Sequence, residues 1–216
     1  MNKQAIVLSI TLIAGMVIGY YSTHYINRSM RLSSTTKIAN SECVLRRTMD
    51  KLWMEHAFFT RQFIIAATAE LEDVELTAQR LFKNQDEIGD AIVPFYGKEA
   101  GKALAQLLRE HISIAADIVK AAKTQDAEKV NSLNTQWQAN AVDIATFLNS
   151  ANPYFDTKVL IAMLNEHLDL TTQELMLRLK RDWKADMTNY DLIIEQIRMM
   201  GQGFAEGIIK QFPNKF

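Results

Sequence analysis

The sequence predicts an all-α protein, an up-down bundle of about six helices built from three helical hairpins and preceded by an N-terminal transmembrane helix. Three observations lead to this fold class. Only 8 Gly and 3 Pro occur among 216 residues, and the common residues lose little side-chain freedom in a helix. Apolar residues recur at a spacing of three and four. A similar hydrophobic pattern also occurs three times along the chain.

The first element is a candidate membrane span. Residues 5–21 are 17 uncharged and mostly apolar residues, which is near the lower length limit for a spanning helix. No small-residue cleavage site of the A-x-A kind follows, which favours a retained single-pass anchor over a cleaved signal peptide. We therefore expect an anchor and juxtamembrane segment at 1–32, a polar linker at 33–41 and the bundle domain at 42–216. The charges that flank the span leave open the side of the membrane on which the bundle lies.

Within the bundle domain, a hydrophobic stretch ends three times in a Glu-His pair. The three histidines are His56, His111 and His167, which are 55 and 56 residues apart. Each lies in an apolar stripe at helical spacing, so each is predicted to face the core while its neighbouring glutamate points about 100° away. This repetition predicts three related helical hairpins.

The return helix of each hairpin carries an acidic residue that we expect to lie near the histidine. Turns are predicted near 72–73, 124–126 and 180–182, and a pattern N-x-x-[DE]-I-[GA] occurs at 84–89 and 140–145. Counting outward from each turn places the position opposite each histidine near Glu87, Asp143 and Asp191. Three histidines and three carboxylates are thus predicted at a similar height in the bundle.

Imidazole and carboxylate are common ligands of zinc, iron, manganese and copper, and the interior of a helical bundle is a frequent place for such sites. Glu174 lies one heptad after His167 and is a further candidate ligand, while Asn84 and Asn140 are candidates to orient the carboxylates. Ferritin-like di-iron chemistry is disfavoured, because it uses Glu-x-x-His rather than adjacent Glu-His. The sequence indicates neither a catalytic residue nor whether the protein is an enzyme.

The alternative is a non-enzymatic structural, sensor or protein-interaction bundle in which the histidines only stabilise the core. Such a bundle would act through a protein partner or as a homo-oligomer. Nucleic acid is disfavoured as a partner, because the formal net charge is −1 and acidic and basic residues are interleaved. No predicted strand precedes the glycine-containing segment 96–102, so a nucleotide-binding loop is also disfavoured.

Three segments resemble an uncharacterised family of small all-helical bacterial proteins: NQDEIGDAIVPFYGKEAGKALAQLLREHI at 84–112, DIATFLNSANPYF at 143–155 and EGIIKQFPNKF at 206–216. The resemblance extends over about residues 45–216 and excludes the predicted membrane segment. It implies an α-helical domain that ends at the C-terminal tail, and it implies no particular activity.

Overall fold

The computed structural model describes residues 41–216, of which Val44–Lys215 form one compact unit. This part of the chain contains six α-helices, so the predicted all-helical bundle is confirmed. The first helix is described over 41–69, and it is followed by α2 (Val74–Tyr96), α3 (Lys98–Lys123), α4 (Ala127–Ala151), α5 (Thr157–Lys180), α6 (Trp183–Gln211) and a short 3₁₀ turn, η1 (Pro213–Lys215). The predicted anchor at 1–32 lies outside the described residues, and within 41–216 no helix meets the length and hydrophobicity that a membrane span requires.

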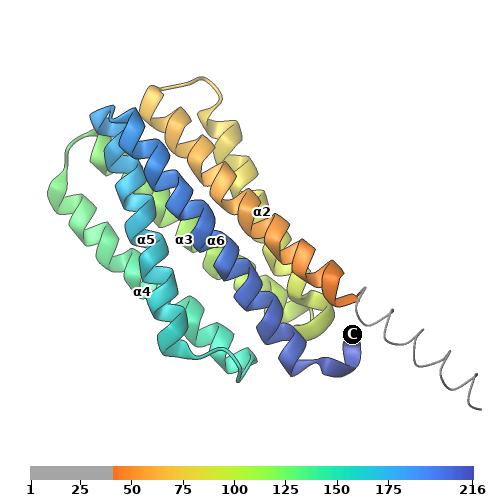
Figure 1. Ribbon diagram of the computed structural model, residues 1–216. Coiled ribbons are helices and arrows are strands. Elements are labelled where there is room, and N and C mark those ends of the chain that lie inside the picture. Colours follow the sequence, from red (N-terminus) through yellow and green to blue (C-terminus); the bar gives the residue numbers. More distant parts are fainter. Residues whose placement is uncertain (1–40) are drawn as a thin grey trace, which may run out of the picture. The chain divides into compact units, whose positions relative to one another are not determined.

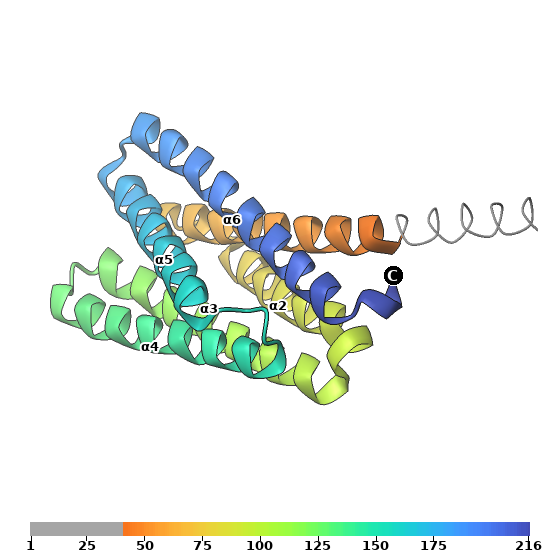
Figure 2. The same ribbon diagram turned by 60° about the horizontal axis from the view of Figure 1, so that its bottom comes forward.

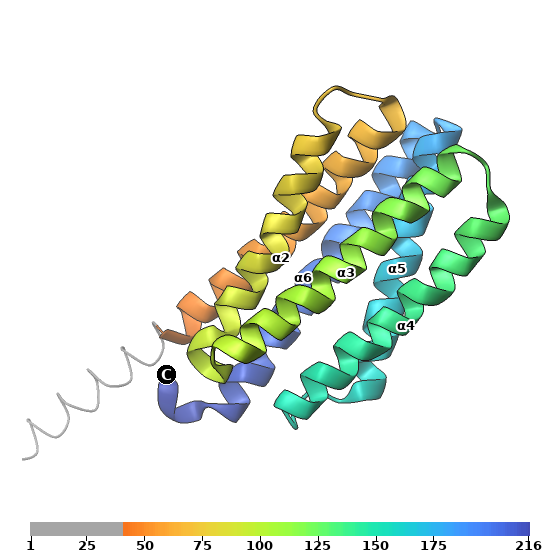
Figure 3. The same cartoon turned by 180° about the vertical axis from the view of Figure 1, so that it is seen from behind.

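The helices run up and down beside one another, as Figure 1 shows. Seen from behind, α3 lies between α2 and α4 (Figure 3). On the other side α6 packs between α5 and the first helix (Figure 2). The first helix and α6 approach closely at Gly201 of α6, where a Cβ atom would lie 3.3 Å from both the Met49 backbone and the Trp53 ring. The first helix, α3 and α5 carry the three histidines, and each is followed by its returning partner.

The three hairpin turns share one backbone geometry. Each contains a single non-glycine residue in the left-handed region, namely Glu70 (φ 57°), Gln125 (φ 58°) and Arg181 (φ 60°). In each turn the next amide donates to a carbonyl five residues back, at 2.9–3.1 Å, which is the bond of a Schellman motif. These turn residues are spaced 55 and 56 apart, as the histidines are. The predicted internal repeat is therefore present in the backbone as well as in the sequence.

The hairpins are separated by sharper breaks in the chain. Pro94 lies inside α2, which ends two residues later at Tyr96, and Gly97 adopts φ 85° before α3 begins. Only glycine takes this backbone conformation readily, so Gly97 permits the change of direction. The second break, at 152–156, contains Pro153 and ends in an Asp156 side chain that caps α5 by accepting from two backbone amides.

One contact near this second break depends on the absence of a side chain. A Cβ added to Gly207 of α6 would lie 2.0 Å from the buried Phe155 ring, whereas one added to Gly203 of the same helix would meet nothing within 4 Å. Phe155 also packs edge to face on Phe204, with ring centroids 5.6 Å apart. Gly207 thus allows the α4–α5 connection to lie against α6.

Candidate functional site

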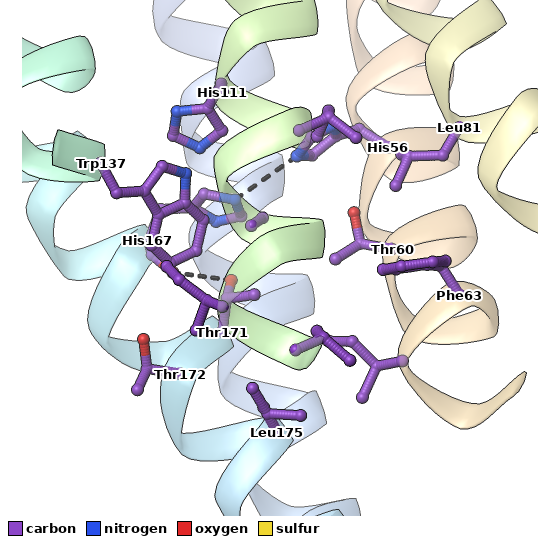
Figure 4. A pocket seen from close by; sticks show the side chains of 15 residues that line it. His56, Thr60, Phe63, Leu81, His111, Trp137, His167, Thr171, Thr172 and Leu175 are labelled. Atoms are coloured by element: carbon purple, nitrogen blue, oxygen red, sulfur yellow. Dashed lines mark hydrogen bonds between the residues drawn. The ribbon is translucent and has the colours of Figure 1, made fainter. Parts of the chain in front are cut away.

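The three repeated histidines converge in the core of the bundle. His56, His111 and His167 are 3%, 4% and 3% exposed. Nε2 of His56 lies 3.4 Å from Nε2 of His167, and the two ring centroids are 5.4 Å apart. The His111 ring is stacked at 6.5 Å from that of His167 (Figure 4). We call this cluster the histidine triad.

An amide side chain from each return helix interacts with the opposite edge of each ring. Gln85 approaches Nδ1 of His56 at 3.3 Å, and Oδ1 of Asn140 lies 2.7 Å from Nδ1 of His111. Gln196 occupies the corresponding place beside His167, although neither its Oε1 nor Nδ1 of His167 has a well-formed hydrogen bond. Each amide follows its histidine by 29 residues.

The amides are themselves held by the helices that carry the histidines. Asn140 donates to the carbonyl of Leu107 at 3.1 Å, and Gln196 donates to that of Met163 at 2.9 Å. In the first hairpin Asn84 fulfils this role by donating to Leu52 at 3.0 Å, while Gln85 contacts the ring. The accepting carbonyl precedes the histidine by four residues in every case. These bonds set the register of each hairpin and so position each ring.

Burial keeps the three imidazoles neutral. Desolvation lowers the pKa of His111 to about 3 and that of His167 to about 4, with the neighbouring His167 adding to the effect at His111. Desolvation also lowers the pKa of His56 well below its usual value, and the other two histidines lower it further. At neutral pH every ring therefore retains an unprotonated nitrogen that is able to accept a hydrogen bond or bind a metal.

The structure places three of the predicted carboxylates away from the triad. Glu87 forms ion pairs with Arg80 at 3.1 Å and Lys83 at 3.7 Å. Asp143 and Asp191 are exposed to solvent. They lie two, three and five positions from the amides that contact the rings. Because each residue turns a helix by about 100°, offsets of two and five direct a side chain to another face, whereas an offset of three moves it by about 60°, to the edge of the same face.

Glu174, the fourth predicted carboxylate, is buried but belongs to a separate ionic cluster. It is 1% exposed and pairs with Arg61 at 2.5 Å. Arg61 also donates to Asp186 through two nitrogens at 3.0 and 2.8 Å, and Arg178 reaches Asp186 at 3.2 Å. Burial raises the pKa of Glu174 to about 7, against the opposing effect of Arg61. This carboxyl group therefore pairs with Arg61 and not with the histidine triad.

A small cavity borders the triad. Its volume is about 30 Å³, and all three histidines line it together with Thr60, Thr171, Thr172 and mainly apolar side chains (Figure 4). Thr171 donates its hydroxyl to the backbone oxygen of His167 at 2.8 Å. The hydroxyl of Thr60, by contrast, has no hydrogen-bond partner among the described residues, although the residue is only 8% exposed.

The sequence pattern predicts the inward-facing histidines but not the amide side chains that hold them. Gln85 and Gln196 were not predicted, and Asn140 contacts a histidine rather than orienting a carboxylate. These amides could be recognised in the sequence from their constant spacing, because each follows its histidine by 29 residues. Arg61 and Asp186 were recognisable only from their contacts, because charged residues on a helix usually face water.

Within residues 41–216, no group of three or more His, Cys, Asp or Glu side chains has the spacing of an assembled metal site. Comparison with protein-family models, with curated proteins and with solved structures finds no match to this chain.

Proposed function

We propose that this protein binds one divalent transition-metal ion through the Nε2 atoms of His56, His111 and His167. The observation that carries the proposal is the separation of 3.4 Å between Nε2 of His56 and Nε2 of His167. Two zinc–nitrogen bonds of about 2.0–2.1 Å at the tetrahedral angle hold their nitrogens about 3.3–3.4 Å apart. The pair thus already has the spacing of two ligands on one edge of a tetrahedral site.

The surroundings of the rings support the same proposal. A histidine that binds a metal usually donates its other ring N–H to an oxygen, which orients the ring. Asn140 offers such an oxygen to His111 at 2.7 Å, and Gln196 lies at the corresponding position beside His167. The Asn140 contact favours a proton on Nδ1 of His111 and leaves its Nε2 available to the metal.

The ligand set of three imidazoles favours zinc, copper or iron over manganese. Manganese prefers oxygen ligands, and the described carboxylates at 87, 143 and 191 lie away from the triad. Three histidines with one non-protein ligand form a well-established zinc set. Binding requires the His111 ring to close on the other two, because its centroid is 6.5 Å from that of His167.

Metal titration of the chelator-stripped full chain in detergent tests the proposal. We expect one Zn²⁺ per chain. Replacement of His56, His111 or His167 by glutamine should weaken binding by more than the about 10–100-fold typical of losing an outer hydrogen-bond partner. His24→Gln is the matched control, since this fourth histidine belongs to the predicted juxtamembrane segment. The proposal is refuted if the wild type binds none of Zn²⁺, Cu²⁺ and Fe²⁺, or if the control loses binding equally.

A purely structural polar core is the second candidate. As oriented, Gln85 places its amide nitrogen, not its oxygen, beside Nδ1 of His56. This arrangement favours a proton on Nε2 of His56, which is then able to donate to His167 across the 3.4 Å contact. On this view the triad would set the register of three hairpins and bind no metal. Loss of folding in the histidine variants, with no metal uptake by the wild type, would favour it.

We also propose that residues 1–32 hold this domain at a membrane. The proposal rests on the uncharged segment 5–21. Fractionation of the full chain and of a variant lacking 1–32 tests it, and recovery of both in the soluble fraction would contradict it.

A further inference from the structure

The polar atoms that line the triad cavity are not all used by the protein. Among residues 41–216, the Thr60 hydroxyl has no hydrogen-bond partner, although it is almost fully enclosed. Leaving such a group unpaired is costly, so native proteins usually supply a partner, often an ordered water. Thr60 follows His56 by four residues and therefore lies on the same face of the first helix. In Figure 4 the two side chains lie on the same wall of the cavity.

The rest of the cavity limits the size and character of an occupant. Its volume of about 30 Å³ suits one water or a molecule of two or three atoms. Ile112, Ile118 and Leu175 are among the buried apolar residues that line it. At the position corresponding to Thr60, the second hairpin has Ala115 and the third has Thr171, whose hydroxyl is already bonded to a backbone oxygen. Thr172 also lines the cavity but is only half-buried, so Thr60 carries the buried lining hydroxyl that has no hydrogen-bond partner among residues 41–216.

We infer that the metal of the triad keeps one open coordination position, which faces this cavity and takes water, hydroxide or a linear anion of up to three atoms hydrogen-bonded to Thr60. This inference rests on the proposed metal function. Three protein ligands leave a tetrahedral ion one free position. The Thr60 hydroxyl is able to donate to the ligand that fills it, and the apolar wall excludes larger molecules.

Cobalt(II) loading followed by azide titration tests the inference on the full chain in detergent. The visible spectrum of Co²⁺ reports its coordination and changes when azide replaces water. We expect the wild type to bind azide, and Thr60→Val to weaken azide binding about tenfold, which corresponds to the loss of one hydrogen bond. Thr60→Ser keeps the hydroxyl group and should bind azide as tightly as the wild type does. Thr68→Val is the matched control, because this threonine lies on the same helix and donates to the Ile64 carbonyl at 2.7 Å.

The outcomes separate this inference from the metal proposal. A cobalt spectrum that depends on the three histidines but does not respond to azide would overturn the open position and leave metal binding intact. Equal azide affinity in Thr60→Val and Thr68→Val would overturn the role of Thr60. If the wild type binds none of Co²⁺, Zn²⁺, Cu²⁺ and Fe²⁺, both proposals are overturned.

Discussion

Acidification should destabilise the metal-free bundle through the histidine triad. An unfolded histidine has a pKa of about 6.5, whereas burial lowers the pKa to about 3 at His111 and about 4 at His167, and well below the usual value at His56. By pH 5 the three histidines are therefore almost fully protonated in the unfolded chain, whereas in the folded chain they stay largely neutral. The stability due to the neutral rings is complete above pH 6.5 and is lost as the pH falls.

The size of the effect follows from linkage. Each histidine costs about 2 kcal/mol of unfolding free energy between pH 7 and pH 5, and the three together cost about 5–6 kcal/mol. Glu174 acts in the opposite direction, because its pKa is raised to about 7 in the folded protein. Glu174 binds a proton more tightly in the folded state, which raises the unfolding free energy by about 2 kcal/mol between pH 7 and pH 5. The expected net loss is about 3–4 kcal/mol, a large part of the stability of a typical domain.

Urea unfolding with a chelator present, followed by tryptophan fluorescence at pH 7 and pH 5, measures this loss. His111→Gln removes one of the three groups, so its loss should be about 2 kcal/mol smaller than that of the wild type. His24→Gln should retain the full loss. The reasoning would be refuted by a wild-type stability that does not fall between the two pH values, or by an identical fall in His111→Gln.

Two further substitutions test the packing and the buried charges. Gly207→Ala places a methyl group 2.0 Å from Phe155 and should cost about 1–3 kcal/mol. The control Gly203→Ala meets nothing within 4 Å and should stabilise α6 by up to about 1 kcal/mol; equal unfolding midpoints for the two variants would contradict this packing. Arg61→Leu leaves buried carboxylates, including Asp186, with less compensation and should cost about 3–5 kcal/mol in urea unfolding. A loss below about 1 kcal/mol would show that Arg61 does not stabilise the fold.

The sequence alone was enough for the helices, the hairpins and the inward direction of the histidines. These features depend on local periodicity: a residue at apolar spacing faces the core whichever helix packs against it. The predicted turns near 72–73, 124–126 and 180–182 agree with the observed breaks between helices, because the residues that end a helix act within one turn of it. The repeat interval of 55 and 56 residues, read from His56, His111 and His167, reappears in the turn geometry.

Only the tertiary structure decided which side chains meet the histidines. The counted partners Glu87, Asp143 and Asp191 differ by two to five positions from Gln85, Asn140 and Gln196, which contact the rings. An error of that size leaves a helix in place along the chain, but it changes the direction of a side chain about the helix axis by about 160° for two positions, 60° for three and 140° for five. The 3.4 Å contact between His56 and His167 depends in addition on how two helices distant in sequence pack together. Periodicity determines the face on which a residue lies, whereas its partner is determined by the register between helices.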